Sequence, residues 1–285
     1  MPFRVTQISD NHLSARHGFA RTNWEATCRH IADNGSDLII STGDIVVDDP
    51  DEADTRAFAR SCFDELPAPW LVVPGNHDIG DGPPDPWQDQ PVTADRVAAF
   101  VSTWGHDRFV TDVEGWRLIG YNSIVMGSGL VAIEAEHDAW LVEQLAGAGG
   151  RRIAMFGHKP VFIDGLDDPP TSMAMPARGR DRMLELVAAH DVALVSTGHL
   201  HDFRARIEGS TTYLWCPTSA FIAPGGPVDP YGGVRQIGLV ELDFDDRALT
   251  WRLVRPEGAT DTSVREISAA HGSIRYSPPA PWEGA

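Results

Sequence analysis

Five apolar runs in this sequence end abruptly in a cluster of polar residues. In chain order from Asp10 to His201 the clusters read DNH, GD, GNHD, GH and GHLH. Near-continuous apolar runs of this length are typical of strands that are buried on both faces. Glycine next to a polar residue lets the backbone turn tightly and keeps other side chains out of the way. Because α/β sheets gather their ligands beyond the carboxyl ends of the strands, the pattern predicts one functional site at that edge.

Amphipathic segments alternate with these runs, and this alternation predicts an α/β fold in which helices cover a sheet. The predicted helices span residues 24–34, 54–66, 94–105, 134–147 and 179–190. Further strands are predicted at 116–123, 211–222, 237–244 and 249–256, with the last two joined as a hairpin at 245–247. These extra strands indicate a second sheet packed on the first. Residues 1–255 are predicted to form one domain, followed by an irregular extension, 256–285, that packs on this domain or on a partner subunit.

The balance of charges argues against several classes of partner. The formal net charge is -18, and a surface this acidic repels nucleic acids and anionic membranes. The three cysteines, Cys28, Cys62 and Cys216, form no CxxC motif, so a disulfide framework is not expected and a cytoplasmic location is predicted. The N-terminus lacks the pattern of a signal peptide, and no apolar run reaches the roughly 18 residues of a membrane span.

Metal binding explains why buried strands end in imidazoles. Five of the 11 histidines fall in the polar clusters, alongside Asp10, Asp44 and Asn76. Packing carboxylates and imidazoles together would be costly without a cation. Residues i and i+2 of an extended backbone point to the same side, so His199 and His201 are expected to reach one site, as are Asp10 and His12.

The kind and number of donors indicate which ions fit. Imidazole nitrogen with carboxylate oxygen suits iron, manganese or zinc better than calcium or magnesium. There are too many donors for one tetrahedral ion, and the count suits two ions about 3.5–4 Å apart, a geometry used in phosphoryl chemistry. The predicted cofactors are therefore two ions of iron, manganese or zinc.

The five clusters in this order resemble the metallophosphoesterases, also called calcineurin-like phosphoesterases. The resemblance implies a four-layer αββα fold, which is a two-sheet β-sandwich flanked by helices. It also implies two metal sites that share Asp44 as a bridge. The implied ligands of one ion are Asp10, His12, Asp44 and His201, and those of the other are Asp44, Asn76, His158 and His199.

The resemblance assigns catalysis to His77, which is not expected to be a metal ligand. In the family this residue faces the phosphate, where it stabilises charge or protonates the leaving oxygen. Asp78 is expected to orient His77 by a hydrogen bond. The implied reaction is the attack on phosphorus by a hydroxide that bridges the two ions.

Differences between the motifs separate the branches of the family. Purple acid phosphatases carry a tyrosine ligand where this chain has Val47, and the protein serine/threonine phosphatases carry GDxVDRG where this chain has GDIVVDD. The remaining similarity is to bacterial phosphodiesterases that act on cyclic nucleotides or glycerophosphodiesters. That branch often has a second histidine where this chain has Lys159.

The predicted function is therefore a phosphodiesterase acting on a small-molecule phosphate ester. A phosphomonoesterase is the nearest alternative, and a nuclease or a non-catalytic metal-binding scaffold ranks below it. Candidate substrate-binding residues are Asn76, His17, Arg178 and Arg180, since arginine can grip a phosphoryl oxygen. The loop that ends near Arg180 is compatible with a lid or with the contact of a homo-oligomer.

Overall fold

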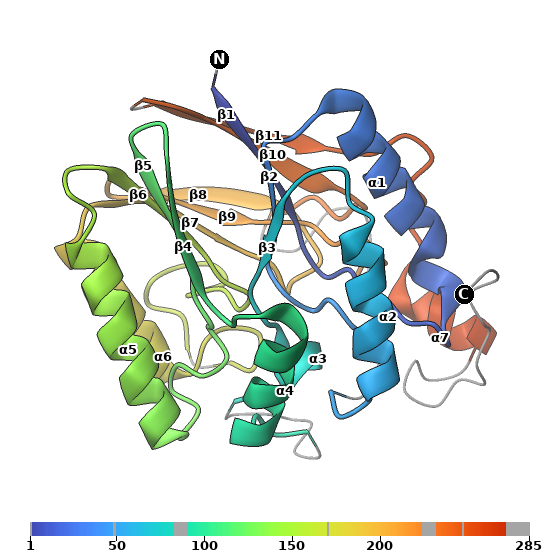
Figure 1. The fold of residues 1–285 in the computed structure, drawn as a ribbon, viewed down its shortest axis with the longest axis horizontal. Helices are drawn as coiled ribbons and strands as arrows, with labels where there is room; N and C mark the ends of the chain where they lie inside the picture. The colour runs from blue at the N-terminus through green and yellow to red at the C-terminus, as the bar shows by residue number, and fades with distance from the viewer. Residues whose placement is uncertain are drawn as a thin grey trace.

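The computed structural model describes residues 2–47, 50–82, 90–169, 171–223, 232–246 and 248–271. Two sheets stand at the centre, with helices on either side (Figure 1). The first sheet has the order β11-β10-β1-β2-β3 and contains β1 (Phe3–Ile8), β2 (Leu38–Ser41), β3 (Trp70–Val72), β10 (Leu239–Asp245) and β11 (Ala248–Val254). The second has the order β4-β5-β6-β7-β9-β8 and contains β4 (Phe109–Val113), β5 (Trp116–Gly120), β6 (Arg152–Phe156), β7 (Val192–Thr197), β8 (Arg204–Glu208) and β9 (Thr211–Trp215).

Parallel strands form the middle of the second sheet and one side of the first, up to the edge strand β3. Strands β1, β2 and β3 run parallel, as do β5, β6, β7 and β9. Antiparallel neighbours complete the edges, namely the β10–β11 hairpin in one sheet and β4 and β8 in the other. The carboxyl ends of the parallel strands therefore gather at one edge of each sheet.

Three apolar layers hold the sheets and helices together. Side chains from the facing sides of both sheets form the central layer, which includes Val5, Leu118 and Phe156. A second layer packs α1 (Arg21–Asn34), α2 (Ala53–Asp64) and α4 (Ala94–Trp104) on the first sheet. A third packs α5 (Val131–Ala146) and α6 (Ala177–Ala189) on the second sheet. This arrangement confirms the predicted four-layer fold.

The predicted elements are found with a few differences at their ends. All five predicted helices form, and a one-turn helix, α3 (Asn76–Ile79), and a 3-10 turn, η1 (Gly18–Ala20), add to them. The strand predicted over 211–222 was too long, because β9 ends at Trp215 and the segment after it turns away as a loop. The short edge strands β4 and β8 were not predicted, since β4 has a single buried residue and β8 has none, so neither shows a buried apolar run.

The C-terminal extension is not wholly irregular. It contains helix α7 (Val264–His271), and backbone hydrogen bonds join Ile222 to Thr262 and Val264. The extension thus packs on the domain itself as far as it is described, while residues 272–285 lie outside the described part. None of the helices in the described ranges has both the length and the apolar character needed to cross a bilayer.

Phe63 of α2 is central to the layer on the first sheet. Its fully buried ring contacts Trp24, Trp70 and Trp104, with centroids 5.3, 5.7 and 5.2 Å away, so it joins α1, β3 and α4. We expect Phe63→Ala to lower the free energy of unfolding by about 3–5 kcal/mol, because it leaves a cavity between these elements. Urea denaturation measures this loss. The exposed Val131→Ala is the control, with an expected change within about 0.5 kcal/mol, and a similar small change for Phe63→Ala would contradict the prediction.

Candidate metal centre

The polar clusters of both sheets meet at the carboxyl ends of the parallel strands. The backbone N–H of Asp10, after β1, donates to the carbonyl of Gly43, after β2, at 2.9 Å. In the other sheet, the N–H of Gly198, after β7, donates to the carbonyl of His158, after β6, also at 2.9 Å. The N–H of His199 then reaches the carboxylate of Asp10 at 3.0 Å and ties the two sheets together. The five clusters therefore surround one point between the sheets.

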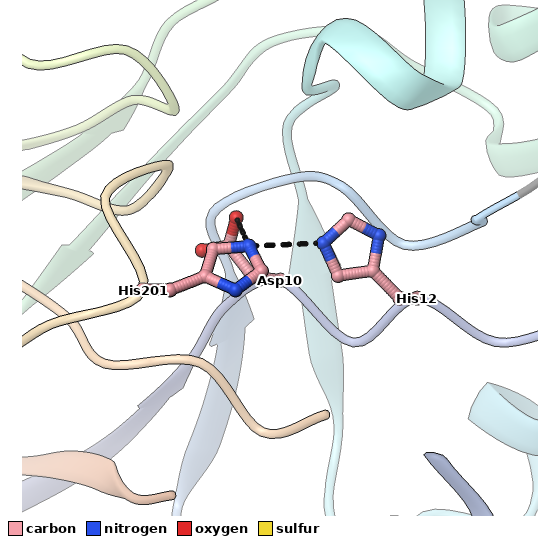
Figure 2. A group of neighbouring side chains, drawn as sticks. All are labelled: Asp10, His12 and His201. Carbon is pink, nitrogen blue, oxygen red and sulfur yellow. Dashed lines mark hydrogen bonds and ion pairs between the residues drawn. The ribbon is translucent and has the colours of Figure 1, made fainter. Parts of the chain in front are cut away.

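One group of potential ligands consists of Asp10, His12 and His201 (Figure 2). The Nε2 atoms of His12 and His201 lie only 3.1 Å apart, and Nε2 of His201 lies 3.3 Å from Oδ1 of Asp10. Asp10 and His12 are buried, and His201 is partly buried. Donor atoms that converge this closely from separate segments are suited to a shared cation.

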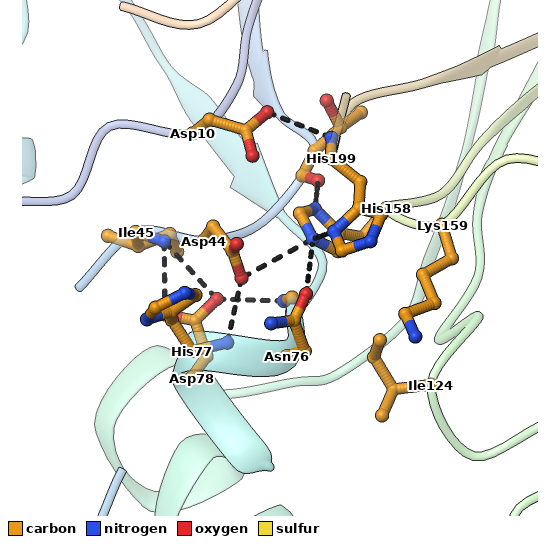
Figure 3. Close-up of polar contacts among 12 residues, drawn as sticks. Asp10, Asp44, Ile45, Asn76, His77, Asp78, Ile124, His158, Lys159 and His199 are labelled. Atoms are coloured by element: carbon orange, nitrogen blue, oxygen red, sulfur yellow. Dashed lines mark hydrogen bonds and ion pairs between the residues drawn. The ribbon is translucent and has the colours of Figure 1, made fainter. Parts of the chain in front are cut away.

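A second group consists of Asp44, His158 and His199 (Figure 3). Nε2 of His158 lies 3.3 Å from Oδ1 of Asp44 and 3.2 Å from Nδ1 of His199. The side-chain oxygen of Asn76 approaches the same nitrogen at 3.0 Å. The four members of one predicted ligand set, Asp44, Asn76, His158 and His199, therefore lie together.

Asp44 links the second group to the first, because its two carboxylate oxygens face different groups. Its Oδ1 faces His158, while its Oδ2 lies 4.0 Å from Nε2 of His12 in the first group. The carboxylate also belongs to a third set of neighbouring donors with His12 and His77. This central place suits the predicted bridging role.

Backbone carbonyls hold two of the imidazoles in a form that can bind a metal. Nδ1 of His158 lies 2.8 Å from the carbonyl of Thr42, and Nδ1 of His201 lies 2.7 Å from the carbonyl of Phe221. In each ring Nδ1–H can donate to the carbonyl, which leaves the lone pair of Nε2 for a cation. These carbonyls were not identified from the sequence, because any residue supplies one and only the fold decides which carbonyl is near.

The charges of the buried groups also suit cations. Burial opposes ionisation of Asp10, but His201 outweighs it and lowers the pKa of this carboxyl to about 2. Burial, together with His77 and His201, lowers the pKa of His12 to about 3, so this imidazole is neutral. Ionised carboxylates beside a neutral imidazole are the forms that ligate metals. The residues present therefore fit a metal centre.

The backbone brings these side chains together by turning, not by continuing the strands. Asp10, His12, Asp44, His199 and His201 all have positive φ, between 45° and 70°. The argument from extended i, i+2 geometry was therefore wrong, although the residues do converge. His199 and His201 belong to different groups. Residues other than glycine are strained in this region, and such strain is tolerated where the surrounding structure enforces it.

Glycines allow the loops to approach this closely. A Cβ atom added to Gly75 would lie 2.2 Å from Oδ1 of Asp44, and one added to Gly198 would lie 1.9 Å from the hydroxyl of Ser9. Any side chain at these positions would displace the loops that carry the potential ligands. The predicted reason for glycine in these clusters is confirmed at these two positions.

His77 points toward the same centre, but its partner differs from the predicted one. Its ring packs edge-on against His12, and its Nδ1 lies 3.2 Å from the carbonyl of Val47. The carboxylate of Asp78 instead accepts hydrogen bonds from the N–H groups of Ile45, Val46 and Gly75. The expectation that Asp78 orients His77 directly was wrong, since this carboxylate is occupied by the backbone of the loops.

Lys159, which replaces the second histidine of the resembling branch, faces away from the potential ligands (Figure 3). Its buried ammonium group lies 2.6 Å from Oδ1 of Asp81 and donates to the carbonyl of Ser172 at 2.8 Å. It therefore links the segment after α3 to the loop before α6. This lysine was noticed in the sequence only as a departure from the family pattern.

The candidate substrate-binding residues lie in different surroundings. Asn76 is at the centre, beside His158. His17 is buried and packs near Phe19, with centroids 6.1 Å apart. The exposed Arg178 pairs with Glu134 of α5 and lines a cavity of about 360 Å³ between α5 and α6, while Arg180 donates to the carbonyl of Asp168. Binding of substrate by His17, Arg178 and Arg180 stays a prediction.

The fold and the grouped carboxylates and imidazoles together define a phosphoesterase that uses metal ions. Residues 3–203 match the calcineurin-like phosphoesterase family, and the chain belongs to it. The predicted family and enzyme class are thereby confirmed.

Relatives in this family carry several activities in their names. The chain is 27% identical over 228 residues to a probable cyclic nucleotide phosphodiesterase of Synechococcus sp., covering 77% of this chain and 82% of that protein. It is 24% identical over 206 residues to the probable glycerophosphodiester phosphodiesterase GpdQ of Arcobacter nitrofigilis, covering 69% and 71%. It is 31% identical over 138 residues to the serine/threonine-protein phosphatase CPPED1 of Bos taurus, covering 47% of this chain but only 41% of that protein.

Solved structures share the fold. A dimetal phosphatase from Danio rerio superposes with a TM-score of 0.58 at 12% sequence identity, covering 89% of this chain and 96% of that one. At this identity the likeness concerns the fold alone.

The ion pair of Lys159 makes a prediction about stability. We expect Lys159→Met to lower the free energy of unfolding by about 3–5 kcal/mol, because Asp81 would keep a largely buried charge without its partner. Adding Asp81→Asn should recover part of this loss, as a double-mutant cycle in urea denaturation would measure. Arg21→Met, which breaks the more exposed pair with Glu25, is the control and should cost at most about 1 kcal/mol. Additive effects of Lys159→Met and Asp81→Asn would contradict the prediction.

Proposed function

We propose that this chain is a dinuclear metal-dependent phosphodiesterase that acts on small phosphate diesters, of the cyclic nucleotide or glycerophosphodiester type. The observation that carries the proposal is the presence of two neighbouring groups of potential ligands. Asp44 belongs to one group and also faces His12 of the other. Two named phosphodiesterases that this chain spans over most of their length support the diester substrate. The named phosphatase CPPED1, of which the chain spans less than half, supports a phosphomonoester substrate as the alternative.

In this proposal Asp10, His12, Asp44 and His201 hold one ion, and Asp44, Asn76, His158 and His199 hold the other. Manganese, iron or zinc suits this mixture of nitrogen and oxygen donors. When bound, such ions lower the pKa of water and offset the negative charge of the phosphoryl group. The two buried aspartates offset part of the ionic charge, which leaves the site positive enough to attract a phosphate within an acidic protein.

His77 is the proposed general acid. With Nδ1 turned to the carbonyl of Val47, its other ring nitrogen remains available to a substrate, where it can donate a proton to the leaving oxygen. The N–H of His77 donates to Oδ1 of Asp44 at 2.8 Å, so the fold ties the acid to the proposed bridging ligand. Asp78 acts one step further away, by holding the loops that carry both Asp44 and His77.

The first test of this proposal is hydrolysis by the manganese-loaded protein. We expect turnover of bis(p-nitrophenyl) phosphate, and we expect His77→Ala to lower kcat by about 10²–10⁴ because the proton donor is lost. The manganese content, measured by mass spectrometry, should stay at the wild-type value. His190→Ala, at the end of α6, is the matched control and should keep full activity.

Each other result of this assay favours a different function. Faster hydrolysis of p-nitrophenyl phosphate would favour the phosphomonoesterase. Full metal content without turnover of any phosphoester would favour the non-catalytic scaffold. Tight binding of a DNA duplex in a fluorescence titration would favour the nuclease, against the net charge of -18.

Asp44 allows a second test that needs no substrate. If one carboxylate serves both ions, Asp44→Asn should lower the bound manganese from two ions per chain to one or none after dialysis. Asp243→Asn, which removes a carboxylate that pairs with Arg4 at the surface of β10, is the control and should retain two ions. Two equally tight ions in Asp44→Asn would contradict the shared ligand.

A further inference from the structure

Phe221 contacts two potential ligands of the same group through different atoms. Its ring stacks on His12, with centroids 4.8 Å apart and an interplanar angle of 27°, and it lies 4.9 Å from the ring of His201. Its backbone carbonyl faces Nδ1 of His201 at 2.7 Å. Phe221 is itself buried, with 6% of its surface exposed, so these contacts exclude water from one side of the group.

His12 differs from His158 and His201 in the way its ring is held. Carbonyl groups face Nδ1 of His158 and of His201, but the buried Nδ1 of His12 has no hydrogen-bond partner among the residues that the structure describes. Hydrogen bonds to the second nitrogen normally set the orientation of a metal-binding imidazole. For His12 this orientation depends instead on ring packing, with Phe221 on its face and His77 at its edge.

The loop of Phe221 is itself fixed by the C-terminal extension. The N–H of Ile222 donates to the carbonyl of Thr262 at 3.0 Å, and the N–H of Val264 donates back to Ile222 at 3.1 Å. A small apolar cluster joins Phe221 to Ile267 of α7 and to Ala20. Phe221 therefore has a defined position against which the ring of His12 can pack.

We propose that Phe221 is a positioning residue for one of the two metal sites: its ring orients His12 and its carbonyl orients His201. This inference rests on the proposed dinuclear function and adds a residue that touches neither substrate nor metal. Without the aromatic face, the imidazole of His12 can rotate before an ion binds, and binding must then fix it. The entropic cost of fixing this ring weakens metal binding at the site that contains His12. The site of His158 and His199 is unaffected, because the ring contacts of Phe221 are with His12, His201 and Phe19.

The test compares the two ions of one protein molecule. In Phe221→Leu, and in Phe221→Ala, we expect one of the two manganese sites to weaken by about 10–100-fold while the other keeps its affinity. Calorimetric titration of the metal-free protein resolves the two sites, and the content after dialysis against a weak chelator should fall from two ions toward one. The leucine variant retains most of the apolar volume, so it keeps the test valid if the alanine variant does not fold.

Phe19→Ala is the matched control. The ring of Phe19 packs at 5.6 Å against Phe221 and at 6.1 Å against His17, and neither of these residues is a proposed metal ligand. It should leave both affinities within about twofold of the wild type, well short of the loss expected when a group that orients a ligand is removed. Equal weakening of both sites in Phe221→Leu, or no weakening, would overturn the inference alone. A wild-type protein that binds fewer than two ions would overturn the proposed dinuclear function, and this inference with it.

Discussion

The central constraint on this structure is that two aspartates and several histidines are buried away from water and next to one another. Asp10 and Asp44 are almost fully buried, and His12 and His158 are equally so. Ionised groups lose their hydration when buried, and this loss is compensated only by opposite charge or hydrogen bonds in good geometry. The two sheets meet this constraint by placing the carboxyl ends of their parallel strands together. In the proposed dinuclear site, bound cations would offset these carboxylates and attract an anionic ester within a chain of net charge -18.

The loops that carry the potential ligands are joined to one another by backbone hydrogen bonds beyond the ends of the strands. Hydrogen bonds join the segment after β1 to the segment after β2, and the segment after β6 to that after β7. The carboxylate of Asp78 accepts further hydrogen bonds from the N–H groups of Ile45 and Val46, after β2, and of Gly75, after β3. A left-handed backbone at five of the potential ligands is sustained by this framework. The precision of the centre is thus a property of the whole sheet edge and not of any one loop.

The family of this protein and its substrate are determined by different residues. The ligand groups and the match over residues 3–203 define a calcineurin-like phosphoesterase. Substrate choice is a separate question, because the residues that would bind a substrate are not fixed by the metal ligands. Lys159 is used to link two loops, and Arg178 pairs with Glu134 beside a cavity between two helices.

The sequence by itself determined most of the strands, the five longest helices and the polar residues that gather at the strand ends, because burial on both faces requires apolar runs. It also determined the family, through five short motifs in a fixed order. Only the tertiary structure decided how the ligands converge, since the left-handed turns at Asp10 and His199 depend on neighbouring loops. It alone placed Asp78 under the backbone of Ile45 and Val46 and brought Phe221 onto His12. Contacts of this kind join residues far apart in the chain through carbonyl groups and ring faces, which leave no pattern in a single sequence.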